Sequence, residues 1–498
     1  MSSSSSKNNS PNSSKNNQDI IDLQKQSSAG FKSSQDDAAK GNLESTSPEE
    51  FLKHQQAVFD KMSPWFADSD KEVPPELVPI YEHLGNQMVS EMMGNIKRGV
   101  DNRNGRDLGA DPEDVPKEYK LLDVACGTGV LWKYLLEAAN ERGIHLSIEA
   151  VDLSGEMVAL AKQNAENILR HPEYSTHKIS VTQSDVLSYA QEQQEMKQGY
   201  YHGAIINAAF GNFWDSQEVL AALTPLLQVD GTLAVSHPLG AEFVQQLHDE
   251  EPSTVPHTLP ATEHAWIQLF HGLSLVGQSF DRTVELGEET ANYYFASARK
   301  SRAKRLETMI RLRGPIASGY GRGGKKLGVP TANLPSSLFE TALEDVSTGV
   351  YLGWAILEGS EAPGRGVPHK AVVNVGYSPT FEGQENPEKI VEAHLILSQD
   401  TVLSDFYGET MRLQLAGFLR PEQKFPSFPE LLFQIKTDVA DAKDALDDKP
   451  YIWLREDEFI SNSSGNWIGV SGGDAAASWE FEDMSVCLES RSDGAHNP

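Results

Sequence analysis

The segment Leu121-Leu-Asp-Val-Ala-Cys-Gly-Thr-Gly129 decides the fold of the first half of this 498-residue chain. An apolar run of strand length enters a Gly-x-Gly turn, and an amphipathic stretch of helical periodicity, Val130 to Glu141, follows it. Glycine lets a backbone approach a ligand closely, and the first turn of the next helix offers free N–H groups. The pattern therefore predicts a strand, a ligand-binding turn and a helix.

The same rhythm extends on both sides of this segment. Up to Lys300, apolar runs of strand length alternate with helix-like segments such as Gly155 to Arg170, which is typical of βαβ units and a parallel sheet. A helical prelude, Pro48 to Lys97, and a polar linker, Asp101 to Lys117, precede the sheet. The strand-like runs are Leu121–Ala125, Ile148–Val151, Ala204–Ile206 and Leu233–Ser236.

Acidic residues end the two strands that follow the glycine turn. Asp152 lies 23 residues beyond Gly129 at the end of one strand, and Asp185 ends the next. The carboxyl ends of parallel strands meet at one edge of the sheet, so these positions should form one crevice. A carboxylate at Asp152 can hold both hydroxyls of a ribose.

This pattern resembles the class I S-adenosylmethionine-dependent methyltransferases over about Pro48 to Lys300. An Asn/Asp-Pro-Pro-Tyr signature is missing, because the fourth strand ends in Asn207-Ala-Ala-Phe-Gly-Asn-Phe-Trp214. The methyl acceptor therefore stays open, and a non-catalytic version of the fold stays an alternative. The resemblance implies S-adenosylmethionine binding at Asp123, Gly127, Gly129, Asp152 and Asp185.

The second half contains a local concentration of positive charge in a chain of net charge −30. The glycines of Gly319 to Gly328 are dense enough for successive N–H groups to form an anion nest. In Pro330-Thr-Ala-Asn333, a hydroxyl and an amide oxygen suit Mg²⁺ that phosphates already hold. Between Thr308 and Phe339 the chain has no acidic residue and five basic ones, Arg311, Arg313, Arg322, Lys325 and Lys326.

Several segments together resemble riboflavin kinases, from about Leu306 to Ile460. They are Gly319 to Asn333, Asn374-Val-Gly-Tyr-Ser-Pro-Thr-Phe381, Val391-Glu-Ala-His-Leu395, Asp405-Phe-Tyr-Gly408 and Gly417 to Phe425. The resemblance implies a six-stranded Greek-key β-barrel with a C-terminal helix, in agreement with the closely spaced strands and turns of this half. It also implies phosphorylation of riboflavin by ATP with Mg²⁺, giving FMN and ADP.

The resemblance assigns roles residue by residue. Ser378 stands where relatives usually have Asn, and Gln423 where Lys is frequent; both departures concern the flavin side. The implied ATP-binding residues are Gly319, Lys325, Thr331, His394 and Tyr407, the metal ligands are Thr331 and Asn333, and the flavin-binding residues are Arg420, Gln423 and Phe425.

Glu392 is the predicted catalytic base. The alternation in Val391-Glu-Ala-His-Leu395 puts Glu392 and His394 on the polar face of a strand. Phosphoryl transfer needs a group that accepts the proton of the attacking hydroxyl, here the 5′-hydroxyl of the ribityl chain. The alternative for Glu392 is a surface salt bridge. The alternative for the whole chain is a flavin-sensing or regulatory binding protein with a primarily methyltransferase activity.

Composition sets the remaining expectations. The charge of −30 argues against nucleic-acid and anionic-membrane partners, and two cysteines allow no disulfide framework. No apolar run approaches a membrane span, so we expect a cytoplasmic protein, with import into an organelle left open. We predict disordered tails at 1–45 and 461–498, a methyltransferase-like domain at 46–300 and a riboflavin kinase domain at 301–460.

Overall fold

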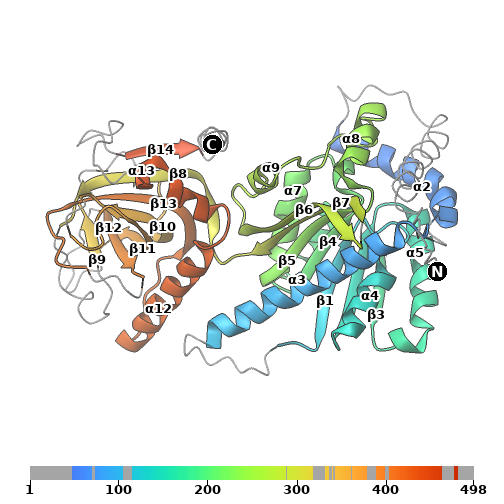
Figure 1. Cartoon of the computed structure of the whole chain (residues 1–498), viewed down its shortest axis with the longest axis horizontal. Helices are drawn as coiled ribbons and strands as arrows, with labels where there is room; N and C mark the ends of the chain where they lie inside the picture. Colours follow the sequence, from blue (N-terminus) through green and yellow to red (C-terminus); the bar gives the residue numbers. More distant parts are fainter. Residues whose placement is uncertain are drawn as a thin grey trace, which may run out of the picture. The chain divides into compact units, whose positions relative to one another are not determined.

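The computed structural model describes two compact units (Figure 1). The first unit contains the chain up to Trp266 together with Gln278–Lys300, and the second contains Ile267–Gly277 and the chain from Ser301 onward. The described residues are 47–69, 73–104, 115–287, 289–317, 331–335, 339, 343–359, 362–377, 389–398, 403–461 and 476–480. The predicted domain limits stay predictions.

The first unit is built on a seven-stranded sheet with the order β3-β2-β1-β4-β5-β7-β6. Strands β1 to β5 are parallel, and β7 is antiparallel to β5. Three of the apolar runs predicted as strands lie inside these elements, and the fourth, Leu121–Ala125, extends one residue beyond β1, which confirms the α/β class. The strands are β1 (Glu118–Val124), β2 (His145–Asp152), β3 (Lys178–Gln183), β4 (Tyr201–Asn207), β5 (Leu227–His237), β6 (Leu275–Leu286) and β7 (Glu289–Lys300).

Helices cover this sheet, and several begin at side-chain caps. The Ser154 hydroxyl accepts from Met157 N at the start of α5, and the Asp215 carboxylate caps α7. The predicted helical prelude is two helices, the second running on to Asn104. The helices are α2 (Pro48–Ser69), α3 (Val78–Asn104), α4 (Trp132–Glu141), α5 (Gly155–Leu169), α6 (Val186–Gln193), α7 (Ser216–Leu223), α8 (Gly240–Glu250) and α9 (Glu263–Gln268).

The second unit is a barrel of six antiparallel strands in the order β8-β13-β10-β11-β12-β9. Ala317, just beyond β8, bridges Asn333 of β9, so the two ends of the sheet meet. Strand β13 returns to lie beside β10, which gives β10 to β13 a Greek-key order. The strands are β8 (Lys304–Pro315), β9 (Thr331–Leu334), β10 (Gly349–Leu357), β11 (Pro368–Tyr377), β12 (Lys389–Ile396) and β13 (Thr410–Pro421).

Two apolar clusters hold the second unit together. Alternate residues of the strands fill the barrel, among them Val373, Ala393 and Leu413. The outer cluster joins Leu352 and other strand residues to the C-terminal helix α12 (Phe428–Ala445), the short helical turn η7 (Tyr451–Glu456) and α13 (Glu458–Ser461). A barrel with a C-terminal helix is therefore confirmed.

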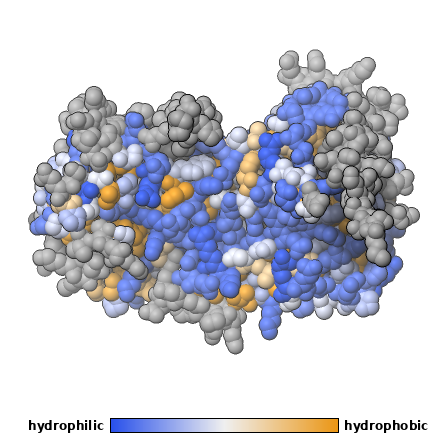
Figure 2. All heavy atoms as spheres, viewed as in Figure 1, coloured by the Kyte–Doolittle hydropathy of each residue, from blue (hydrophilic) through white to orange (hydrophobic). Residues whose placement is uncertain are grey.

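Two further features concern the ends and the surface. A short strand, β14 (Ala476–Glu480), pairs with β8, while the neighbouring residues of the predicted C-terminal tail lie outside the described residues. In the described ranges, no helix combines the length and the apolar character needed to cross a membrane. On the face shown in Figure 2, the described residues are largely hydrophilic, with scattered hydrophobic patches.

Candidate active site

Three neighbouring barrel strands place a row of polar side chains on one face. Asn333 on β9 is paired with Glu392 on β12, and Glu392 is paired with Asn374 on β11. Directly paired residues point to the same side, with Cβ atoms about 5 Å apart. The adjacent Ala332, Ala393 and Val373 belong to the barrel interior, so the row faces outward.

A second pair extends this face. Thr331 is paired with His394, and the Thr331 Oγ1 lies 3.2 Å from His394 Nδ1. Burial lowers the pKa of His394, although the carboxylates of Glu392 and Asp438 oppose the shift, so the imidazole is neutral near pH 7. The register thus brings both predicted metal ligands, the predicted base and the predicted ATP-binding histidine together.

The predicted flavin side lies along the same row of the sheet. Arg420 on β13 pairs with Val350, which pairs in turn with Asn374. Arg420 donates through Nε and Nη2 to the two carboxylate oxygens of Asp438 on α12, at 2.9 and 2.7 Å. The Arg420 guanidinium also lies 5.8 Å from the centre of the Phe425 ring.

Sequence reasoning missed Asn374 and Asp438. Asn374 stands in a segment that carries the family resemblance, but only the strand register shows that it flanks Glu392. Asp438 is an acidic residue in an amphipathic helix and is nonetheless buried. Its burial beside Arg420 is a tertiary contact without a local sequence signal.

Of the predicted ATP-binding residues, Tyr407 is exposed, and its N–H donates to Asp405 Oδ1 at 3.1 Å. The predicted flavin-binding residue Gln423 is also exposed. Gly319 and Lys325, like Ser378, lie outside the described residues.

Two of the five basic residues between Thr308 and Phe339 form ion pairs inside the barrel unit. Arg311 donates to Asp457 at 2.6 Å, and Arg313 donates to both oxygens of Glu358 at 2.8 and 2.9 Å. The positive charge of this segment is therefore partly neutralised by structural partners. Both carboxylate partners lie outside the segment, which itself contains no acidic residue.

The first unit gathers four of its predicted residues, Asp123, Gly127, Gly129 and Asp152, at the carboxyl ends of β1 and β2, whereas Asp185 lies two residues beyond the end of β3 and not in the strand as predicted. The Asp152 carboxylate accepts from Gly127 N at 2.8 Å and from Ser154 N at 2.9 Å. Gly127 and Gly129 have φ angles of +54° and +76°, which favour glycine. Among the described residues, and apart from Gly127 and its two chain neighbours, no heavy atom lies within 4 Å of the point where a Cβ of Gly127 would stand, so the backbone is open to a ligand there.

Asp123 and Asp185 also have defined contacts. Asp123 Oδ2 accepts from Trp132 Nε1 at 2.7 Å, whereas its buried Oδ1 has no hydrogen-bond partner within the described ranges. Asp185 Oδ1 accepts from Leu187 N and Ser188 N and caps α6. Capping of α6 gives Asp185 a structural role. Its role in ligand binding stays a prediction.

Sequence reasoning did not find three further features of this crevice. Ala125 and Ala208, which follow β1 and β4, have φ angles of +53° and +57°, a strained conformation for a residue other than glycine. Asp60 of α2 accepts from the Ser154 hydroxyl at 2.5 Å, beside Asp152. Helix α2 therefore packs next to the predicted ribose-binding carboxylate.

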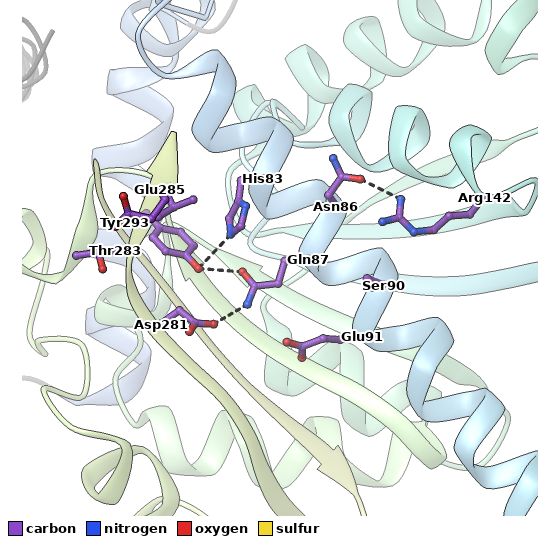
Figure 3. Close-up of a pocket in the computed structure, with 11 residues that line it drawn as sticks. His83, Asn86, Gln87, Ser90, Glu91, Arg142, Asp281, Thr283, Glu285 and Tyr293 are labelled. Carbon is purple, nitrogen blue, oxygen red and sulfur yellow. Dashed lines mark hydrogen bonds between the residues drawn. The ribbon is translucent and has the colours of Figure 1, made fainter. Parts of the chain in front are cut away.

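A separate polar groove of about 650 Å³ lies between α3 and the β6–β7 pair (Figure 3). Tyr293 OH donates to Gln87 Oε1 at 3.0 Å, and Gln87 Nε2 donates to Asp281 Oδ2 at 2.7 Å. None of the residues predicted for binding or catalysis lines this groove. The polar side chains that line the groove are largely hydrogen-bonded to one another.

Each half of the chain matches the model of a known protein family. A family model described as riboflavin kinase matches residues 306–446, and one described as a methyltransferase domain matches 121–231. Mouse riboflavin kinase is 40% identical over 153 residues, which cover 31% of this chain and 91% of the relative. Human riboflavin kinase is 38% identical over 151 residues, covering 30% and 90%.

The chain belongs to the riboflavin kinase family. It is a riboflavin kinase that also carries a methyltransferase domain. Among solved structures, a riboflavin kinase from Trypanosoma brucei matches with 20% identity and a TM-score of 0.25, covering 35% of this chain and 94% of that chain. A SAM-dependent methyltransferase from Aquifex aeolicus matches with 15% identity and a TM-score of 0.24, covering 38% and 89%.

Burial of Asp123 makes the stability of this riboflavin kinase depend on pH. Burial raises the pKa of Asp123 to about 7, and the nearby Asp152 charge adds to the shift, although the Trp132 hydrogen bond opposes it. The folded form holds this proton more tightly than the unfolded chain, so stability falls as pH rises from about 4 to 7, by at most on the order of 4 kcal/mol. Asp123→Asn, which cannot ionise, should remove that loss.

Scanning calorimetry at pH 5 and pH 8 checks this expectation. The gain in Tm of Asp123→Asn over the unmodified chain should be larger at pH 8. Asp249→Asn, at an exposed carboxylate of α8, serves as the control and should change Tm equally little at both values. An Asp123→Asn effect of the same size at pH 5 and pH 8 contradicts the assignment.

Proposed function

We propose that Glu392 is the general base for transfer of the γ-phosphoryl group of ATP to the 5′-hydroxyl of riboflavin. The observation that carries this proposal is the outward-facing row of Asn333, Glu392 and Asn374, with Thr331 and His394 beside it. The carboxylate of Glu392 lies at the centre of the row, where it can accept the proton of the attacking hydroxyl. The side chains on both sides of it, Asn333 and Asn374, are amides, so Glu392 is the one carboxyl group of this row.

Thr331 and Asn333 would hold Mg²⁺ with the nucleotide. A hydroxyl and an amide oxygen at alternate positions of β9 suit a hard cation that keeps substrate phosphates as its other ligands. When bound, Mg²⁺ neutralises the negative charge of the phosphates. His394 contacts Thr331 Oγ1 and so restrains the orientation of this hydroxyl.

Arg420, Gln423 and Phe425 would bind the flavin. Asp438 holds the guanidinium of Arg420 by two hydrogen bonds, and Phe425 lies against it. A planar guanidinium and an aromatic ring offer flat surfaces of the kind on which an isoalloxazine ring stacks.

The first unit would bind S-adenosylmethionine in its crevice. The backbone is open at Gly127, the Asp152 carboxylate has two acceptor oxygens, and Asp123 Oδ1 has no hydrogen-bond partner among the described residues. These features fit a ligand with hydroxyl and ammonium donors. S-adenosylmethionine supplies an activated methyl group when bound. The acceptor of that group stays open. The domain limits and the cytoplasmic location stay predictions from the sequence.

The deciding experiment incubates the purified full chain with riboflavin, ATP and Mg²⁺ and separates the flavins by chromatography. We expect FMN and ADP in equal amounts, with turnover lost when Mg²⁺ is chelated. Riboflavin binding without FMN formation would instead favour a flavin-sensing protein.

The metal ligands give a second expected result. Thr331→Val and Asn333→Ala each remove one oxygen ligand and should raise KM for MgATP by about tenfold, while KM for riboflavin changes little. Ser398, which follows β12 near the barrel rim, gives the control Ser398→Ala, for which we expect KM for MgATP to stay within about twofold. An equal rise in both KM values would contradict a metal-ligand role.

A further inference from the structure

Arg365, in the loop between β10 and β11, is a buried arginine whose guanidinium holds another loop in place. Its side chain is 3% exposed. Nε and Nη2 donate to the two carboxylate oxygens of Glu409 at 2.9 and 2.7 Å. Nη2 also donates to Asp405 O at 3.0 Å, and Nη1 donates to Pro363 O at 3.0 Å.

The loop that Arg365 holds, Asp405–Glu409, is named here the nucleotide loop because it carries Tyr407. Arg365 bonds to both ends of this five-residue loop, at Asp405 O and at the Glu409 carboxylate. Within the loop, Tyr407 N donates to Asp405 Oδ1, and Gly408 has a φ of +85°. The backbone of the loop is thus restrained while the Tyr407 ring stays exposed.

The nucleotide loop is also hydrogen-bonded to the segment just beyond β8, which in turn bridges Asn333 of β9. Gly408 N donates to Ile316 O, and Ile316 N donates to Glu409 O, both at 2.8 Å. The next residue, Ala317, donates through its N–H to Asn333 O at 2.8 Å. A continuous set of contacts therefore runs from Arg365 through the nucleotide loop to Asn333.

We propose that Arg365 is a positioning residue that sets the affinity of the kinase for MgATP. The proposal rests on the proposed roles of Tyr407 and Asn333. A guanidinium donates in a rigid planar fork, so it fixes the direction of Glu409 and of the Asp405 carbonyl together, which a flexible ammonium cannot do. Arg365 itself has its donors committed to protein oxygens, so it acts through the loop.

The matched comparison uses Arg365→Lys and Arg412→Lys in the full-length protein. Arg412 is also buried, and it forms an ion pair with the carboxylate of Glu358 and donates to Phe459 O, two partners that lie outside the nucleotide loop. Arg365→Lys should raise KM for MgATP about tenfold, with kcat within about threefold and KM for riboflavin unchanged. Arg412→Lys should lower Tm to a similar extent or more and leave KM for MgATP unchanged.

Arg365→Gln, which removes the charge, should raise KM for MgATP at least as much. Circular dichroism at the assay temperature establishes whether each variant is folded. If Arg365→Gln is not folded, Arg365→Lys still tests the proposal. An unchanged KM for MgATP in folded Arg365→Lys overturns the proposal. So does an equal rise of KM for both substrates.

Tyr407→Ala separates this proposal from the proposed ATP site. If Tyr407 is the contact that Arg365 positions, the double variant Arg365→Lys/Tyr407→Ala should raise KM for MgATP by less than the product of the two single effects. If Tyr407→Ala has no effect while Arg365→Lys raises KM, the assignment of Tyr407 fails, and Arg365 acts through Ile316 and Asn333. An additive double variant overturns positioning through Tyr407.

Discussion

Glu392→Gln should lower kcat for riboflavin phosphorylation by about 10²–10⁴-fold, the usual contribution of a general base. Glutamine keeps the size of the side chain and an oxygen beside Asn333 and Asn374, but it cannot accept the proton of the 5′-hydroxyl. Since Thr331 and Asn333 are unchanged, KM for MgATP should stay within a few-fold. Rapid-quench measurement of FMN formation at saturating substrates gives the chemical step directly.

Glu307→Gln is the matched control for this result. Glu307 is an exposed glutamate on β8 of the same barrel and lies outside the β9–β12–β11 row. We expect its kcat to stay within about twofold of the unmodified enzyme. Turnover of Glu392→Gln at the unmodified rate would remove Glu392 from the mechanism and make the surface salt bridge the better reading.

Asp152→Ala should weaken S-adenosylmethionine binding by roughly ten- to a hundredfold, or about 1.5–3 kcal/mol. A carboxylate that accepts from two ribose hydroxyls in a mostly buried crevice is costly to replace, and Asp152 also orders the turn by accepting from Gly127 N and Ser154 N. Calorimetric titration of the full chain with S-adenosylmethionine measures the loss.

Asp152→Asn separates the two contributions of this residue. Asparagine keeps one oxygen acceptor for the turn but removes the charge, so its binding loss should fall between those of the unmodified chain and Asp152→Ala. Circular dichroism of the same samples reports whether the chain is folded. If neither S-adenosylmethionine nor S-adenosylhomocysteine binds at millimolar concentration, the first unit is a scaffold that has lost its ligand.

Local sequence signals predicted the elements well. Strand-length apolar runs, the glycine turn before α4 and the alternation in Val391–Leu395 depend on neighbouring residues only, so they were readable without a structure. The methyltransferase-like sheet and the barrel with its C-terminal helix follow from these signals together with the family resemblance. The predicted base, Glu392, and the predicted metal ligands, Thr331 and Asn333, lie on one face.

Long-range contacts decided what the sequence left open. Which residues flank Glu392 depends on the register between β9, β12 and β11, because a shift by one residue turns every side chain to the other face. The same holds for charge, because the sequence shows Arg311 and Arg313 in a basic segment but does not show that Asp457 and Glu358 pair with them.

The sequence by itself determined the order of strands and helices, the two halves and the residue types at the kinase site. Only the tertiary structure decided that Asp438 holds Arg420, that Asp60 of α2 lies beside the predicted ribose-binding carboxylate, and that Arg365 holds the nucleotide loop. The physical reason is the range of the forces involved. Periodicity and turn preference act between near neighbours in the chain, whereas a buried ion pair joins residues whose closeness exists only after folding has closed the loops between them.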